Sequence, residues 1–320
     1  MRAFVTGAGG YMGQSLVKVL QEKGYEVRGL ARNPARLHNL ADAGVEAVLG
    51  DIRRLESIEG FFDGTDVVFH LAGTMVGHER ELYLTNIVGT KNVLEAATSA
   101  GVKRFVLGSS ATVYGGHGGE FIDENSQCHP VMPYGRSKLE SEQVVLEKSG
   151  EGLIGGSVCR IGGVYGPRSQ MLMLENAGRT HVRLVGKGDN WMSVVHVEDV
   201  ASALLAAAER GHPGGIYNIV DDEPVRLKDF YNYLAYRLGA PDAKHISEAN
   251  AKRLARIVGF FGRVTGKAVV FNADFVKMIL ASLKLSNEKM RTELGIQLKH
   301  PNYRVGLDSI LNELGAKAAT

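Results

Sequence analysis

The chain of 320 residues carries 37 basic and 35 acidic side chains, for a formal net charge of +2 at pH 7. Its length exceeds what one small hydrophobic core fills, so we expect one large α/β domain or a large domain with a smaller appendage. The balanced charge argues against nucleic-acid binding and favours a small-molecule partner.

The two cysteines, Cys128 and Cys159, lie in different segments without metal-ligand spacing. This argues against a disulfide framework or a structural zinc site, so no metal is expected, and it fits a reducing, cytoplasmic location. The chain begins directly with an apolar strand and a glycine turn, unlike a signal peptide. No segment reaches the roughly 20 apolar residues that span a bilayer.

Strands and helices are predicted to alternate over the first half of the chain. Apolar runs bounded by glycine predict the strands, and apolar residues at helical spacing predict the helices. Such alternation is typical of parallel strands joined by right-handed crossovers, the doubly wound, Rossmann-type α/β sheet. The strands are expected at residues 3–6, 27–31, 46–49, 66–71, 104–107 and 153–160, and the helices at 11–23, 34–43, 55–61, 81–100 and 134–148.

The alternation becomes less regular after residue 160. We therefore predict a Rossmann-type domain over residues 1–160 and a smaller, mainly substrate-binding C-terminal lobe over 161–320, with some segments returning to the large sheet. Strands are expected there at 182–185 and 216–219, and helices at 200–210, 227–238, 247–258, 273–283 and 303–314.

A glycine-rich turn lies between the first strand and the first helix. Gly7 permits a tight turn, Gly10 lets backbone N–H groups approach a pyrophosphate at the positive helix N-terminus, and Gly13 lets the helix lie close to the strand. With Tyr11 and Met12, which begin the helix, these glycines are expected to bind a dinucleotide. Glycine turns alone are common, but the strand before and the helix after favour this interpretation.

The end of the second strand bears on which dinucleotide is bound. An acidic residue there usually holds the adenosine ribose, but this chain has Ala31 followed by Arg32. Arg32, with Arg36 as a helper, could pair with a 2′-phosphate, which favours NADP while leaving NAD open; an ordinary surface arginine is the alternative. Asp51 and Ile52 are placed to meet the adenine, although Asp51 could equally be a solvated loop carboxylate.

Tyr134 and Lys138 stand one helical turn apart on a predicted helix. A tyrosine with an ordinary pKa of about 10 is a poor acid–base group at neutral pH, and a nearby ammonium stabilises its phenolate. Lys138 could also hold the nicotinamide ribose. A surface Tyr–Lys pair is the alternative, but the segment around Ser110 follows a predicted strand at the carboxyl edge of the sheet, where a hydroxyl can bind a reacting oxygen.

These motifs together resemble the extended short-chain dehydrogenase/reductases, the NAD-dependent epimerase/dehydratase family, over nearly the whole chain. The resemblance rests on the glycine turn, on the Tyr–Lys pair and on four further segments, His-Leu-Ala-Gly at 70–73, Asn-Ile-Val-Gly-Thr at 86–90, Gly-Ser-Ser-Ala-Thr-Val-Tyr-Gly at 108–115 and Val-Tyr-Gly-Pro at 164–167.

The resemblance implies a role for each matching residue. Ser110 corresponds to the catalytic serine, Tyr134 to the acid–base residue, Lys138 to its partner and Asn86 to the supporting helix asparagine. Ser109 and Thr112 are weaker hydroxyl candidates, with Ser109 expected to contact the cofactor. The remaining cofactor contacts implied are Leu71, Ala72 and Gly73 along the dinucleotide and Gly163 and Val164 beside the nicotinamide, whereas His70 is expected to be structural.

The resemblance also implies a homodimer packed through the helices at 86–97 and 134–148. Family members that act on nucleotide-linked sugars typically carry an arginine where this chain has Met192, and a thioether cannot neutralise a diphosphate, although Lys187 or Arg168 might compensate. Glu198 and Asp199 begin a predicted helix, so we interpret them as capping residues.

The apolar segments at 257–262 and 268–271 could line a greasy substrate cleft, or equally form ordinary core or a dimer contact. Our first hypothesis is an NADP-dependent oxidoreductase that interconverts a ketone or aldehyde and an alcohol on a fairly apolar small substrate. The second is a nucleotide-sugar epimerase or dehydratase with tightly bound NAD(P), and the third is a non-catalytic redox sensor. Fold similarity alone cannot choose among them.

Overall fold

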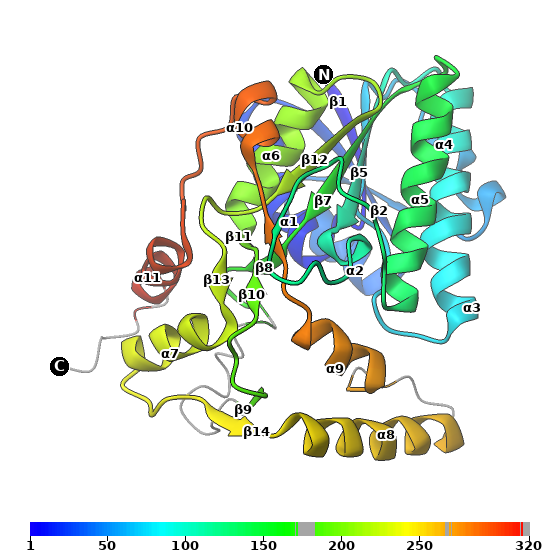
Figure 1. The fold of residues 1–320 in the computed structure, drawn as a ribbon. Helices are drawn as coiled ribbons and strands as arrows, with labels where there is room; N and C mark the ends of the chain where they lie inside the picture. Colours follow the sequence, from blue (N-terminus) through cyan, green and yellow to red (C-terminus); the bar gives the residue numbers. More distant parts are fainter. Residues whose placement is uncertain (170, 172–182, 266–268, 270, 314, 316–320) are drawn as a thin grey trace.

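The computed structural model describes residues 1–169, 171, 183–265, 269, 271–313 and 315. A sheet of seven parallel strands forms its centre, in the spatial order β12-β7-β5-β4-β1-β2-β3 (Figure 1). The chain builds β1, β2 and β3 in one direction, then returns to the far side of β1 for the rest. The strands are β1 (Arg2–Thr6), β2 (Glu26–Ala31), β3 (Glu46–Leu49), β4 (Val67–His70), β5 (Arg104–Ser110), β7 (Gly155–Ile161) and β12 (Gly215–Ile219).

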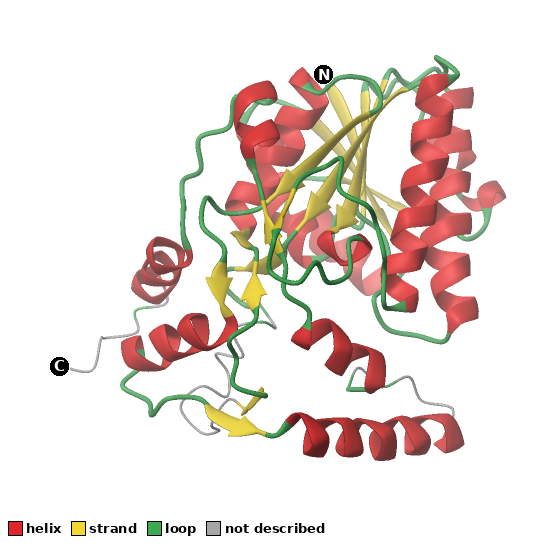
Figure 2. Cartoon of the chain, in the orientation of Figure 1, coloured by secondary structure: helices red, strands yellow, loops and turns green. Residues whose placement is uncertain are grey.

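The strand order reverses between β1 and β4, which confirms the doubly wound, Rossmann-type prediction. In folds of this type a crevice opens at that switch point, at the carboxyl ends of the strands. Two helix layers cover the sheet (Figure 2). The first contains α1 (Tyr11–Glu22), α2 (Pro34–Asp42) and α6 (Val197–Arg210), and the second contains α4 (Gly89–Ser99) and α5 (Pro133–Gly150). α1 packs on α6, and α4 packs on α5.

The helix predicted over 55–61 is wrong. Two short 3₁₀ turns, Leu55–Ser57 and Glu59–Phe61, occupy this segment. The Ser57 hydroxyl donates to the Arg54 carbonyl at 2.8 Å and accepts from the Asp51 backbone N–H at 3.0 Å, and such local bonds compete with helix formation. Gly60 further lowers the helix propensity.

The long helix predicted over 81–100 is interrupted. It begins as α3 (Glu79–Leu82), widens into a π-helical turn over Tyr83–Val88 and continues as α4. Such turns occur frequently at functional sites, and this one carries Asn86. Strand β5 is three residues longer than predicted, so Ser109 and Ser110 belong to the strand itself.

The C-terminal part of the chain both completes the large sheet and forms a smaller lobe. α6 and β12 lie after residue 160 yet belong to the large layers. Residue 182 of the strand predicted at 182–185 lies outside the described residues. The small lobe contains β9 (Arg183–Val185) paired with β14 (Lys244–Ile246), β10 (Trp191–Met192) paired with β13 (Val225–Arg226), and the helices α7 (Leu227–Arg237), α8 (Glu248–Thr265) and α9 (Ala273–Leu280).

Short strands and the last two helices connect the lobe to the large sheet. β8 (Gly163–Tyr165) pairs with β11 (Val194–His196), and β6 (Phe121–Ile122) pairs with β15 (Lys284–Leu285), followed by α10 (Glu288–Glu293) and α11 (Tyr303–Glu313). Among the helices that the structure describes, none combines the length and apolar character needed to cross a membrane.

Candidate active site

The glycine turn follows β1 and is packed too tightly for side chains. Gly7 adopts a φ of +72°, and a Cβ there would stand 2.9 Å from the backbone nitrogen of Ala72. A Cβ on Gly13 would collide with the Gly7 carbonyl oxygen, and the Gly10 N–H donates to that same oxygen at 2.8 Å. The first turn of α1 therefore lies directly against the ends of β1 and β4.

The N-terminus of α1 is open to an anion. Its N-cap, Gly10, offers no side-chain acceptor, and no acidic residue lies in the first turn. The backbone N–H groups of the first turn, starting with those of Tyr11 and Met12, therefore remain available with the positive end of the helix dipole. The Tyr11 phenol lies against the loop after β8, because a Cβ on Gly166 would stand 2.5 Å from its oxygen. This cradle fits a pyrophosphate.

Arg32 lies exposed just after β2, and its guanidinium makes no hydrogen bond or ion pair with any described residue. The side chain of Arg36 lies outside the described residues. Asp51 is not a solvated carboxylate, because Arg53 binds it with the Nη2–Oδ2 distance at 2.5 Å. This hydrogen bond, with a smaller contribution from Arg32, lowers the pKa of Asp51. Ile52 beside it is buried.

His70 has the structural role that was expected. It is fully buried at the end of β4, with Nδ1 2.7 Å from the Thr6 hydroxyl and Nε2 3.0 Å from the Thr90 hydroxyl. Burial lowers the pKa of His70 to about 3, so the ring is neutral. The following backbone is fixed to the glycine turn as well, since the Ala72 N–H donates to the Thr6 hydroxyl at 3.1 Å, and Leu71 packs into the core.

Tyr134 and Lys138 lie in the first two turns of α5, which begins with Pro133 at its first position. Tyr134 is half-buried and Lys138 is 4% exposed. Burial raises the pKa of Tyr134, and a hydrogen bond with Ser110 acts in the opposite direction. Burial also lowers the pKa of Lys138 to about 8, although the Glu142 carboxylate raises it. At neutral pH the phenol is therefore protonated and Lys138 is mainly cationic.

The two adjacent serines of β5 face opposite ways, as strand geometry requires. Ser110 accepts hydrogen bonds from the backbone N–H and the hydroxyl of Thr112, at 3.2 and 2.9 Å, and reaches Tyr134. Ser109 is buried and donates to Glu142 at 2.5 Å. Ser110 and Tyr134 thus come together, whereas the Ser109 hydroxyl is held by an internal carboxylate.

Asn86 connects the loop after β4 to α5. Its side-chain oxygen accepts from the Thr74 N–H at 2.8 Å, and its amide donates to the Thr74 carbonyl at 2.9 Å and to the Ser137 hydroxyl at 2.8 Å. A Cβ on Gly73 would stand 3.1 Å from the Asn86 side-chain oxygen. The Thr74 and Ser137 partners were not found in the sequence, because they depend on a contact between distant segments.

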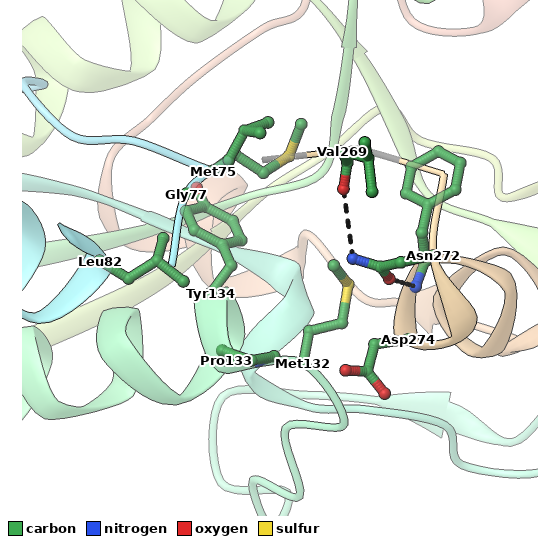
Figure 3. Close-up of a pocket in the computed structure, with 11 residues that line it drawn as sticks. Met75, Gly77, Leu82, Met132, Pro133, Tyr134, Val269, Asn272 and Asp274 are labelled. Carbon is green, nitrogen blue, oxygen red and sulfur yellow. Dashed lines mark hydrogen bonds between the residues drawn. The ribbon is translucent and has the colours of Figure 1, made fainter. Parts of the chain in front are cut away.

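A small cleft with a volume of about 60 Å³, partly open to solvent, lies beside Tyr134 (Figure 3). Most of its described lining residues have apolar side chains, Asn272 and Asp274 add polar groups, and none is a cation. Apart from Tyr134, the lining residues are Met75, Val76, Gly77, Leu82, Met132, Pro133, Val269, Asn272, Asp274 and Phe275.

The apolar segments suggested for the substrate cleft behave differently from one another. Val269 lines the cleft, Phe271 packs inside the small lobe, and residues 268 and 270 lie outside the described residues. The 257–262 segment is not ordinary core, because Phe260 and Phe261 are 59% and 60% exposed. Met192 packs against the small-lobe core.

Gly163 and Val164, which were expected to lie beside the nicotinamide, belong to strand β8. The Gly163 N–H donates to the Ser193 carbonyl at 2.9 Å. Arg168, considered above as a compensating cation for a substrate diphosphate, lies beside the start of α1. Its Nη2 is 3.5 Å from the Gln14 side-chain oxygen. Sequence spacing gave no sign of this contact, which places an exposed cation near the pyrophosphate cradle. Lys187 is also exposed.

The prediction that Glu198 and Asp199 cap their helix is wrong. The N-cap of α6 is His196, whose Nδ1 accepts from the Glu198 N–H at 3.3 Å. Asp199 instead binds the chain before α11, accepting from the backbone N–H groups of Lys299 and His300 at 2.7 and 3.0 Å. The pair anchors the tail of the chain to α6.

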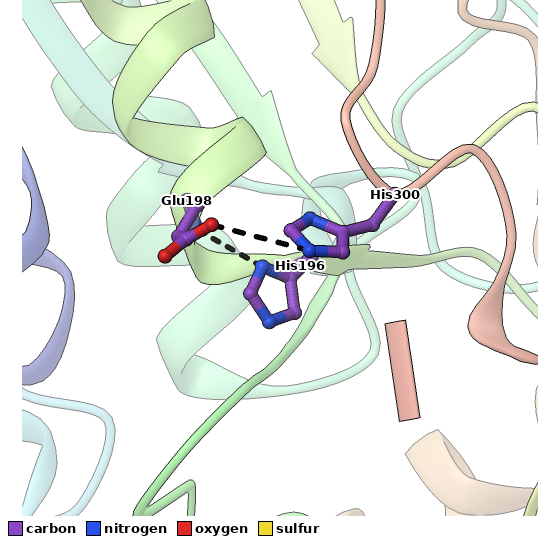
Figure 4. A group of neighbouring side chains, drawn as sticks. All are labelled: His196, Glu198 and His300. Atoms are coloured by element: carbon purple, nitrogen blue, oxygen red, sulfur yellow. Dashed lines mark hydrogen bonds and ion pairs between the residues drawn. The ribbon is translucent and has the colours of Figure 1, made fainter. Parts of the chain in front are cut away.

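The side chains of His196, Glu198 and His300 lie close together, with potential metal-binding atoms within 4.8 Å of one another (Figure 4). Glu198 pairs with Lys299 at 2.7 Å, and His300 Nδ1 lies 2.9 Å from Asp199. Glu198 is already paired with Lys299, and Asp199 with the backbone N–H groups of Lys299 and His300. We therefore interpret the cluster as a structural connection.

Comparison with known proteins agrees with this geometry. The profile of the NAD dependent epimerase/dehydratase family matches residues 3–220. The chain is 30% identical to a 4-hydroxy-2-methyl-3-oxo-4-farnesyl-3,4-dihydroquinoline-1-oxide ketoreductase of Stigmatella aurantiaca, over 97% of this chain and 96% of the relative. It is 32% identical to a 3-beta-hydroxysteroid dehydrogenase of Mycolicibacterium neoaurum, over 72% and 68%. The solved structure of MoeE5 with UDP-glucuronic acid and NAD is similar, with a TM-score of 0.77 and 25% identity over 98% of this chain and 99% of that one.

Proposed function

Because the chain belongs to the NAD-dependent epimerase/dehydratase family, the extended short-chain dehydrogenase/reductases, and is an NAD(P)-dependent enzyme, we propose that it is a ketoreductase for a fairly apolar substrate. The reaction interconverts a ketone or aldehyde and an alcohol. The observation that carries this proposal is the cleft beside Tyr134, whose described lining residues have mostly apolar side chains and include no cation for a diphosphate. Two relatives have names that specify a farnesylated quinoline and a steroid, both largely apolar molecules.

In this proposal Tyr134 is the acid–base residue. A reduced nicotinamide dinucleotide held at the glycine turn before α1 would supply the hydride for the carbonyl carbon. Tyr134 donates its proton to the carbonyl oxygen, and the Ser110 hydroxyl, oriented by Thr112, binds that oxygen. The raised pKa of Tyr134 supports the reducing direction, since a protonated phenol is the form that donates. Lys138 holds the ribose and stabilises the phenolate left after transfer, and Asn86 is a positioning residue.

We propose NADP as the preferred dinucleotide. The open N-terminus of α1 and the Gly7 turn fit a pyrophosphate, while Arg32 offers an exposed guanidinium without a described ion-pair partner to a 2′-phosphate. Asp51 is already neutralised by Arg53, so it does not oppose that phosphate strongly. Arg168 supplies a further cation beside α1.

The alternative function is a nucleotide-sugar epimerase or dehydratase with tightly bound NAD(P). The similarity to MoeE5 with UDP-glucuronic acid favours it. The lack of a cation in the described lining of the cleft counts against it, as does the neutral thioether of Met192, which packs against the small-lobe core.

A carbonyl panel tests the proposal. Purified protein should consume NADPH stoichiometrically with one or more apolar ketones and carry no nicotinamide absorbance after purification. Tightly bound dinucleotide with no net NADPH consumption, but turnover of a nucleotide sugar, would establish the alternative instead. Tight NADP binding without any turnover would indicate a redox sensor.

We further propose a homodimer formed through α4 and α5, in a cytoplasmic protein. A groove between these helices is lined by apolar groups such as Val144 and Leu153 and by charged groups such as Lys91 and Glu147, which a second copy would cover by a two-fold contact. Both cysteines are free, which supports a reducing compartment. Sedimentation equilibrium should give a dimer, and a Leu153→Glu variant, at a leucine that is 50% exposed, should give a monomer.

A further inference from the structure

Helix α8 lies at the lower edge of the molecule, on the side away from the large sheet (Figure 1). It exposes several large apolar side chains. Its inner face, with Ala251 and Ala255, packs against α9 and β9. The outward side chains are exposed to unusual fractions, 45% for Leu254, 47% for Ile257, 59% for Phe260 and 60% for Phe261. A contiguous apolar surface of this kind usually marks an interaction site.

The exposed apolar side chains form a stripe along the helix. Leu254, Ile257 and Phe261 follow one another at intervals of three and four residues, so they share one face. Phe260 extends this surface, with its ring centroid 5.9 Å from that of Phe261. The stripe faces solvent rather than the small-lobe core.

Basic side chains border this stripe. Lys252, Arg253 and Arg256 are exposed, and their spacing places them together on the neighbouring face. Lys252 pairs with Glu248 at 3.3 Å, but Arg253 and Arg256 make no ion pair with a described residue. The surface thus combines aromatic and aliphatic groups with uncompensated positive charge.

We propose that α8 docks this protein onto the surface of an anionic lipid bilayer. A helix with bulky apolar residues on one face and arginines and lysines beside it lies in the plane of the interface, with the apolar side chains among the acyl chains and the cations at the phosphate headgroups. A second copy fits less well, because a two-fold contact through α8 brings the same basic groups toward each other.

The position of α8 would bring the docked membrane close to the substrate cleft, an inference that rests on the proposed ketoreductase function. α8 packs directly on α9, and Phe275 of α9 and Val269, between the two helices, line the cleft beside Tyr134. A docked α8 therefore places the bilayer next to elements of the cleft wall. An apolar ketone dissolved in the membrane can then enter without crossing water.

Vesicle flotation tests the docking without substrate or cofactor, so its result is independent of the proposed reaction. The probes are vesicles of phosphatidylcholine alone and of equal parts phosphatidylcholine and phosphatidylglycerol. Wild-type protein should float with the anionic vesicles and at least about tenfold less with the neutral ones. The double variant Arg253→Gln/Arg256→Gln should bind about fivefold more weakly for each charge removed.

Matched variants separate docking from general surface effects. Phe260→Ser/Phe261→Ser should lose roughly tenfold or more of the binding. Phe121→Ser, which removes a phenylalanine 64% exposed on β6, and Lys18→Gln/Lys23→Gln on α1 should bind as wild type does. All variants should keep the wild-type melting temperature and turnover of a water-soluble ketone.

Three results would overturn the proposal: absence of vesicle binding, equal binding to neutral and anionic vesicles, or wild-type binding by the two α8 variants. The wild type could instead sediment as an oligomer while the Phe260→Ser/Phe261→Ser variant sediments as a smaller species and binds vesicles unchanged. That result would make α8 a contact between copies of the protein. Normal docking by a protein inactive on every ketone would remove the proposed reaction and leave the docking standing.

Discussion

The Asn86 amide donates to the Ser137 hydroxyl at 2.8 Å, and this bond connects the π-helical turn before α4 to the helix that carries Tyr134 and Lys138. The Ser137 hydroxyl in turn donates to the Tyr134 carbonyl at 2.8 Å, so Asn86 is linked to Tyr134 through Ser137. The same Asn86 side chain holds the loop after β4 through two bonds to Thr74. Three segments around the proposed catalytic tyrosine therefore depend on one buried amide.

Replacement of Asn86 by alanine should loosen this arrangement. The part-buried Thr74 N–H and carbonyl and the buried Ser137 hydroxyl lose their partner, so the free energy of unfolding should fall by about 1–3 kcal/mol. Turnover should fall while KM changes little, because Asn86 positions Tyr134 without touching substrate. Urea unfolding and steady-state kinetics measure the two effects. Asn92→Ala, which removes a comparable 2.8 Å bond to the Ile52 carbonyl, is the control, and an equal loss of turnover there would contradict the positioning role.

Tyr134→Phe should lower turnover by about two orders of magnitude or more, because it removes the proton donor and keeps the ring. The affinity for NADPH, measured by fluorescence titration, should stay nearly unchanged. Tyr83→Phe, at a tyrosine 48% exposed near the same helix, should behave as wild type. Retention of most activity by Tyr134→Phe would remove the proposed mechanism.

The reduction rate should depend on pH through Lys138. Its pKa of about 8 means that the ammonium is present below that pH and is lost above it, while the phenol of Tyr134, with a raised pKa, stays protonated throughout. We therefore expect kcat/KM for ketone reduction to fall as the pH rises through about 8. Lys138→Arg should abolish that inflection, because an arginine does not titrate in this range. A flat wild-type profile from pH 6 to about 10 would be inconsistent with this role of Lys138.

Arg32→Ala should raise the Kd for NADPH by at least about tenfold and leave the Kd for NADH nearly unchanged, because only the former carries the 2′-phosphate that the guanidinium would bind. Isothermal titration measures both constants. Arg54→Ala, at an exposed arginine of the neighbouring loop, serves as the control. Equal weakening of both dinucleotides by Arg32→Ala would argue for a general electrostatic effect.

Glu142→Gln should destabilise the fold by about 3–5 kcal/mol, since it leaves the charge of Arg160 buried without its counterion. The two side chains are 1% and 5% exposed, with Nη2 2.8 Å from Oε2, and Glu142 also accepts from Ser109. Chemical denaturation gives the value. Glu22→Gln, at an exposed glutamate that ends α1, should change it by less than about 0.5 kcal/mol.

The sequence was a good guide where local pattern alone decides the structure. Apolar runs bounded by glycines predicted all seven strands of the large sheet. The spacing of Tyr134 and Lys138 correctly placed both residues on one helix. It failed at 55–61, where the Ser57 side chain competes for the backbone, and at Glu198 and Asp199, whose partners lie about 100 residues away at Lys299 and His300. Such contacts leave no periodic signal in the chain.

The sequence by itself therefore determined the family, the doubly wound sheet and the glycine turn that fits a dinucleotide, because each depends on residues close together in the chain. Only the tertiary structure decided what binds the Ser109 hydroxyl, what holds Asn86 and which face of α8 is left to solvent. These features arise when distant segments pack together and bury some side chains at the expense of others, and a linear pattern does not specify that packing.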